Sequence, residues 1–105
     1  MKTVTISAEM FRGVVWPVCA FGSAEGGIAE LRTGVRVLDK LEEPAEKIQT
    51  ADSLEWRLPS DCLAHEFEFE DEEAAFLHKV LEGSVSKLPM FQAKDLLPIL
   101  DGLQG

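Results

Sequence analysis

The chain has 105 residues, 46% of them hydrophobic, which suits a single folded domain over residues 1–105 with its own apolar core. Nineteen acidic and ten basic residues give a net charge of −9, which argues against direct binding of nucleic acid or of an anionic membrane surface. Two cysteines, no apolar signal segment and no stretch of about 18 apolar residues favour a cytoplasmic protein with reduced thiols over a secreted or membrane-spanning one.

The first half of the chain predicts a strand, an ambiguous segment and a long helix. Residues 2–6 alternate β-branched apolar and polar side chains, which is typical of a strand. Residues 8–22 suit either a helix capped by Ser7 or an extended segment around Trp16, and both alternatives stay open. Over 27–43, apolar residues three and four apart predict an amphipathic helix whose buried stripe is Ile28, Leu31, Val35 and Leu38.

The second half predicts a hairpin and two helices. Residues 45–53 have a polar composition that predicts a loop. The alternating runs 54–58 and 63–70 flank a few turn residues and predict a β-hairpin. A helix over 71–82 starts in acidic residues that suit the positive end of its dipole, and Gly83 is expected to end it. A short helix follows Asp95, with Pro98 in its first turn.

Together these elements predict an α+β fold. A small antiparallel sheet, built from the 54–58 and 63–70 hairpin with strand 2–6 as a possible third member, packs against three to four helices. Whether Trp16 and Trp56 lie in the core or at an interface stays open, although Trp56 is included in the expected core. The expected core consists of Val4, Ile6, Ile28, Leu31, Val35, Leu38, Trp56, Phe67, Phe69, Leu77, Leu81, Leu97 and Leu100.

No residue pattern predicts a metal or catalytic site. Cys62, His65 and His78 are the nearest approach to a zinc ligand set, but their spacing matches neither C-x-x-C nor H-E-x-x-H. Glu66 and Glu68 lie about 7 Å apart along a strand, yet glutamates alternating with phenylalanines are ordinary for a half-buried strand. We therefore expect no metal, no cofactor and no enzymatic activity, with a metal-dependent enzyme as the last alternative.

Charge patterning favours a protein partner instead. A basic row of Arg32, Arg36 and Lys40 recurs every four residues on the predicted helix, and an acidic row of Glu66, Glu68 and Glu70 lines the predicted strand. Pairing of these rows between copies predicts a self-associating interaction or assembly module. The alternative is an acidic inhibitor or nucleic-acid mimic that blocks a basic DNA-binding or host-defence protein. It requires a continuous exposed acidic surface formed by Glu66, Glu68, Glu70, Glu72 and Glu73. The candidate partner-binding residues are Glu66, Glu68, Glu70, Arg32, Arg36, Lys40 and Trp16.

The layout of three segments resembles that of small accessory proteins of tailed bacteriophages, most of them uncharacterised. The segments are LRTGVRVLDKLEE, EFEFEDEEAAFLHKVLEG and DLLPILDGL, and the resemblance covers residues 28–103. It implies a phage-encoded protein of the host cytoplasm or the virion. The roles that it implies are virion accessory protein, assembly chaperone or inhibitor of a host system, and it carries over no functional residue.

Overall fold

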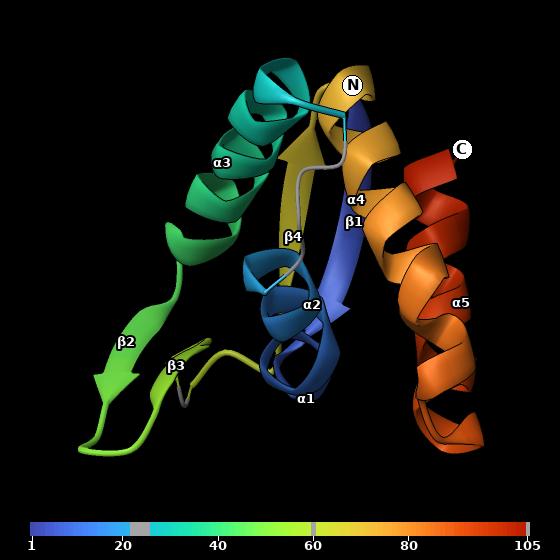
Figure 1. Cartoon of the computed structure of the whole chain (residues 1–105). Coiled ribbons are helices and arrows are strands. Elements are labelled where there is room, and N and C mark those ends of the chain that lie inside the picture. Colours follow the sequence, from blue (N-terminus) through green and yellow to red (C-terminus); the bar gives the residue numbers. More distant parts are fainter. Residues whose placement is uncertain (22–25, 60, 105) are drawn as a thin grey trace.

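The computed structural model describes residues 1–21, 26–59 and 61–104 and shows an α+β fold (Figure 1). Within these ranges, four main helical segments, at residues 8–20, 28–42, 71–84 and 90–104, accompany two small antiparallel sheets, so the predicted fold class is confirmed. The elements in chain order are β1 (Lys2–Ser7), α1 (Ala8–Met10), a π-helical turn (Phe11–Val15), α2 (Trp16–Ala20), α3 (Ile28–Glu42), β2 (Glu46–Gln49), β3 (Leu54–Arg57), β4 (Ala64–Phe69), α4 (Asp71–Ser84), a 3₁₀ turn (Val85–Lys87) and α5 (Met90–Gln104).

The strands pair differently from the prediction. β1 pairs antiparallel with β4, so that Val4 lies opposite Phe67, and β2 pairs antiparallel with β3. The predicted hairpin of 54–58 with 63–70 is therefore wrong, because β3 pairs with a segment that was expected to be a loop. A local turn explains this choice: the backbone N–H of Thr50 donates to the Ser53 carbonyl at 2.9 Å and closes the β2–β3 hairpin.

One face of the β1–β4 sheet forms the centre of the core. Val4 and Phe67 are buried there, and the Phe11 ring stacks on Phe67 with ring centroids 6.1 Å apart. The continuous helical stretch 8–20 covers this face, as does α5, which packs against β1 with Gly102 close to Val4. Of the expected core, the residues that are buried are Val4, Ile6, Phe67, Phe69, Leu77, Leu81 and Leu100, while Trp56 is half-buried.

Local hydrogen bonds and composition set the helix ends. The Ser7 hydroxyl accepts the Met10 backbone N–H at 3.2 Å, which starts the helical stretch 8–20 and decides that open alternative. α4 continues past Gly83, and α5 begins at Met90, so Pro98 lies inside a helix rather than in a first turn. The longer α5 buries Leu96, Ile99, Leu100 and Leu103, whereas Leu97, expected in the core, is 55% exposed.

α3 packs with a different face from the predicted one. Its buried side chains are Thr33, Val37 and Leu41, whereas Ile28, Leu31 and Val35 are 71%, 54% and 49% exposed and Leu38 is half-buried. Val35 and Val37 are two residues apart and so point about 160° apart around the helix. Ile28, Leu31 and Val35 therefore face away from the core, whereas Leu38, at the edge of the predicted stripe, still packs against it. The polar side chains beside Val37 are bound by the start of α4, which favours this orientation of the helix.

Candidate functional site

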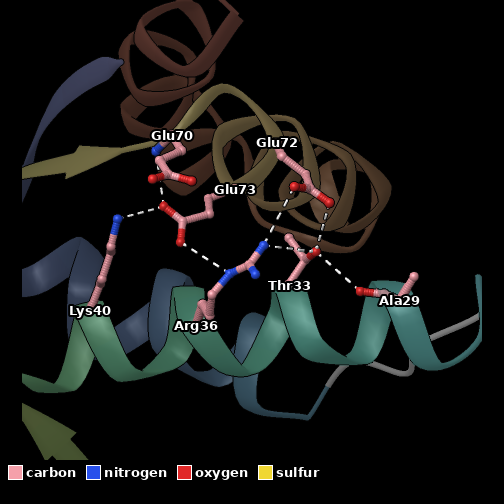
Figure 2. A network of polar contacts seen from close by, with 7 residues as sticks. All are labelled: Ala29, Thr33, Arg36, Lys40, Glu70, Glu72 and Glu73. Atoms are coloured by element: carbon pink, nitrogen blue, oxygen red, sulfur yellow. Dashed lines mark hydrogen bonds and ion pairs between the residues drawn. The ribbon is translucent and has the colours of Figure 1, made fainter.

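A network of polar contacts joins α3 to the first turn of α4 (Figure 2). Glu70 precedes α4 and Glu73 lies in its first turn, so the two form a capping box in which the Glu70 backbone N–H donates to Glu73 Oε1 at 2.9 Å. The same carboxylate accepts a hydrogen bond from Lys40 Nζ at 2.5 Å, and Arg36 Nε lies 3.5 Å from its second oxygen. The Glu73 side chain is only 2% exposed, so its carboxylate is shielded from solvent.

The electrostatics of Glu73 keep it ionised. Burial by itself raises the pKa of this carboxyl, but hydrogen bonds from Lys40 and the Glu70 backbone, with the charges of Lys40 and Arg36, lower the pKa further than burial raises it. A general acid or base works best with a pKa near neutrality. A carboxylate shifted downward and bound on both oxygens instead suits a fixed structural anchor.

Thr33 is a polar residue on the buried face of α3, and its hydrogen bonds explain how it is accommodated there. Its Oγ1 lies 3.1 Å from the Ala29 carbonyl oxygen and 3.2 Å from Glu72 Oε1, and Arg36 donates to it at 3.4 Å. Arg36 also reaches Glu72 Oε2 at 3.5 Å (Figure 2). A buried hydroxyl is stable when it is hydrogen-bonded, and here every partner comes from α3 or α4.

The basic row of α3 is thus largely engaged within the chain. Arg36 and Lys40 bind Glu72 and Glu73, not the expected acidic row, while Arg32 is exposed. The engagement of Glu72 and Glu73 also interrupts the continuous acidic surface that a nucleic-acid mimic would need.

The acidic row itself is exposed. Glu66 and Glu68 lie on the sheet face that points away from the core, opposite Thr5 and Thr3 of β1, and Glu70 is exposed at the start of α4. Among the described residues, neither Glu66 nor Glu68 makes an ion pair. Their carboxylates are available to a partner from outside the chain.

Trp16 lies in the core. Its side chain is 4% exposed, and the indole Nε1–H donates to Glu42 Oε2 at 2.9 Å, which ties α2 to the end of α3. In this conformation Trp16 presents no surface to a partner, so its expected role as an anchor gains no support. Phe21, 77% exposed at the end of α2, packs edge-on against it with ring centroids 5.8 Å apart.

The α3 stripe, defined as Ile28, Leu31, Val35 and Leu38, is the exposed apolar surface that the sequence did not identify as such. Their spacing of three, four and three residues predicted one apolar face of a helix, but that face was expected to lie in the core. Arg32 and Asp39 flank the stripe on one side, two helical turns apart and both exposed. Within the described residues neither makes an ion pair.

A second surface feature is a hollow of about 570 Å³ along β4. Its walls are the C-terminal end of α3 and four consecutive strand residues, which are His65, Glu66, Phe67 and Glu68. Because successive strand residues point to opposite faces, a hollow that touches all four opens onto the edge of the strand. Lys40, Glu43, Pro44 and Met1 complete its lining.

The residues considered for a metal do not come together. In the described ranges, no group of three or more histidine, cysteine, aspartate or glutamate side chains is placed to hold an ion. The Cys62 thiol donates to the Ala64 carbonyl at 3.2 Å, the His65 ring packs edge-on against Phe67, and His78 Nδ1 lies 3.3 Å from Glu82. Burial, with a smaller contribution from the Glu42 charge, raises the pKa of the Cys19 thiol to about 12.

Comparisons with known proteins do not add to this geometry. No protein-family model, no curated protein and no solved structure matches the chain. The resemblance to tailed-phage accessory proteins therefore stays an expectation. Over the residues that the structure describes, no helix combines the length and apolar composition required to cross a membrane.

Proposed function

We propose that this protein is a non-enzymatic interaction module that associates with a second copy of itself through α3. The observation that carries the proposal is the exposure of the α3 stripe: three large apolar side chains, 71%, 54% and 49% exposed, lie in line on one helix. Contiguous exposed apolar surface on a small domain commonly marks an interaction site. The spacing of three, four and three residues is that of a helix–helix seam.

The charges beside the α3 stripe favour a second copy in the antiparallel orientation. Placing Val35 of one copy against Leu38 of the other brings Arg32 of each copy beside Asp39 of its partner. Each contact then occurs twice, as a two-fold axis requires. A parallel arrangement would place Arg32 and Asp39 of one copy on the opposite edge of the seam from those of the other copy, so that no Arg32–Asp39 pair forms.

The size of the surface sets the expected affinity. α3 has 15 residues and so is about 22 Å long, which offers less than the roughly 800 Å² per partner of a standard interface. We therefore expect reversible association in the micromolar range. Sedimentation equilibrium across about 5 to 500 µM covers the concentrations at which so small an interface should form.

Two exposed leucines provide the matched test. Leu31→Glu places a charge in the α3 stripe, whereas Leu63→Glu makes the same change at a side chain that is 85% exposed and lies outside α3. The first should shift the monomer–dimer equilibrium to monomer, and the second should leave it unchanged. A wild-type protein that stays monomeric over the whole range, or equal effects of both variants, would contradict the proposal.

A charge exchange tests the orientation separately. Arg32→Asp and Asp39→Arg should each weaken the dimer, because each places two like charges together across the interface. The double variant should restore association, since every pair is again of opposite sign. Single variants without effect would contradict the antiparallel arrangement even if Leu31→Glu abolished association.

The acidic-inhibitor alternative has less support. It requires a continuous run of exposed carboxylates, and two members of that run, Glu72 and Glu73, bind Arg36, Lys40 and Thr33 of the same chain. Glu66 and Glu68 remain as a short exposed row, which fits a narrower ligand than a nucleic-acid-binding surface.

A further inference from the structure

The free edge of β4 is a second surface, separate from the α3 stripe. β4 has one strand neighbour, β1, in the described residues, so its other edge lacks a strand partner. That edge borders the hollow of about 570 Å³. We infer that it binds an extended peptide segment in which basic side chains alternate with apolar ones.

The ladder with β1 determines which backbone groups face the hollow. The Ala8 N–H donates to the Leu63 carbonyl at 2.8 Å, which makes these two residues a hydrogen-bonded pair. Hydrogen-bonded and non-hydrogen-bonded pairs alternate along an antiparallel ladder. In the observed register, residues 65, 67 and 69 of β4 therefore exchange hydrogen bonds with β1, and Ala64, Glu66 and Glu68 point their backbone groups outward.

A side-chain contact agrees with this assignment. The Cys62 thiol donates to the Ala64 carbonyl at 3.2 Å, so that oxygen points away from β1. Within the described residues, the backbone N–H and C=O groups of Glu66 and Glu68 have no hydrogen-bond partner. An added strand would satisfy them, which is how extended peptides bind to sheet edges in other proteins.

The same geometry specifies the side chains of the peptide. A residue that exchanges backbone hydrogen bonds with Glu66 lies about 5.5 Å from it, with its side chain on the same sheet face. The next residue but one stands beside Glu68 in the same way. Basic side chains at these two positions would meet the two exposed carboxylates, with Glu43 nearby in the lining of the hollow.

The residue between the two basic ones points to the other face. There Phe67 and Pro44 line the hollow, so an apolar side chain fits. Two cations line the hollow, and each has an acidic neighbour: Lys40 is bound to Glu73, and the Met1 ammonium lies 3.6 Å from Asp71. Neither therefore repels a basic peptide strongly. The segment that fits is therefore basic, apolar, basic.

A second copy of β4 fits this edge poorly. Two β4 strands paired antiparallel about Phe67 would place Glu66 of each copy opposite Glu68 of the other. Like charges directly opposite each other destabilise a strand pair, and charged edges commonly prevent such self-pairing. A basic peptide meets the same row with complementary charge, so it is favoured over self-association at this edge.

The test uses a capped heptapeptide of alternating lysine and valine with the full-length Leu31→Glu variant, which removes any effect of self-association. The control peptide has the same composition with its lysines grouped together, so net charge is equal and alternation is lost. Amide hydrogen exchange followed by NMR reports on single residues. The alternating peptide should slow amide exchange at Glu66 and Glu68. The grouped peptide should not slow exchange at either amide.

Two variants separate backbone from charge. Glu66→Pro removes an N–H that the peptide needs and that β1 does not use, so it should abolish peptide binding while the fold persists. Glu66→Gln with Glu68→Gln keeps the backbone and should weaken binding about three- to tenfold, as expected for two exposed charge pairs.

Several outcomes would overturn the inference. These are unchanged exchange at Glu66 and Glu68 with saturating peptide, equal binding of the two peptides, or undiminished binding by a folded Glu66→Pro variant. Should Glu66→Pro fail to fold, undiminished binding by the double glutamine variant would overturn it equally. Failure of the Leu31→Glu variant to become monomeric would contradict the proposed self-association and leave this edge unaffected.

Discussion

Neutralising the buried carboxylate of Glu73 should lower the stability of the fold measurably and in a pH-dependent way. Glu73→Gln keeps the shape of the side chain and an oxygen that can accept the Glu70 N–H, but it removes the charge that Lys40 and Arg36 bind. Hydrogen bonds to charged groups contribute about 1.5–3 kcal/mol. Lys40 and Arg36 are 35% and 50% exposed, so solvent screening reduces the expected loss at pH 7 to about 1–2 kcal/mol.

The pH dependence follows from the lowered pKa of Glu73. A carboxyl whose pKa falls on folding stabilises the protein fully above its ordinary pKa of about 4.3, and this contribution is lost as the pH falls through the folded-state pKa. Urea unfolding of both proteins, followed by circular dichroism, measures the difference. It should stay constant from pH 7 to about pH 5 and shrink at lower pH.

Two further variants make the test specific. Glu68→Gln, at an exposed position, should change the free energy of unfolding by less than about 0.5 kcal/mol. Lys40→Met leaves the buried carboxylate with Arg36 as its remaining cation and should cost about 2–3 kcal/mol at pH 7. A Glu73→Gln protein as stable as wild type at pH 7, or a difference that does not change with pH, would refute the anchoring role.

Two other predictions concern single side chains. Gly83→Ala should raise the free energy of unfolding by about 0.5–1 kcal/mol, because nothing lies within 4 Å of the added methyl. Gly34→Ala should gain less or lose stability, since its methyl would lie 2.9 Å from the Phe76 ring. Urea titrations that rank the two variants the other way would contradict this. At pH 8 Ellman's reagent should label Cys62 in the folded protein before Cys19, whose pKa of about 12 keeps it a thiol, and equal labelling rates would contradict the burial of Cys19.

Strand positions were predictable because alternation is a local signal. β1 and β4 both carry two apolar residues on one face, and both are strands of the structure. Their pairing was not predictable in the same way, since the sequence gives no direct measure of long-range register. The nearness of 54–58 to 63–70 favoured a hairpin, but the Thr50–Ser53 turn offered β3 an earlier partner.

The site was predictable as a set of residues more than as an arrangement. The sequence identified Glu66 and Glu68 as an exposed row, and both are exposed on the outer face of β4. It also identified the basic row of α3, but periodicity does not reveal which acids lie near Arg36 and Lys40 in space. The acids that they bind, Glu72 and Glu73, were expected at the helix start and, in the inhibitor alternative, on an acidic surface, but not as partners of the basic row.

The polar network and the exposed α3 stripe are two consequences of one choice of helix face. α3 has two faces with apolar residues. The face with Val37 and Leu41 is buried, whereas the more apolar α3 stripe is largely exposed to solvent. Fully burying a large aliphatic side chain contributes about 1.5–3 kcal/mol. Leaving Ile28, Leu31 and Val35 71%, 54% and 49% exposed therefore forgoes about 3–5 kcal/mol in total. The contacts of Thr33, Arg36 and Lys40 with α4 must offset that amount, together with the burial of Val37 and Leu41.

This balance links folding to association. A helix held by its polar side keeps its most apolar side available, and a second copy can then recover part of the forgone burial energy without rearranging the core. Weakening the network should therefore act on both properties: Glu73→Gln should lower the stability of the monomer, and it should also weaken the dimer by loosening the orientation of α3. A Glu73→Gln protein that is destabilised yet dimerises with wild-type affinity would show that the two properties are independent.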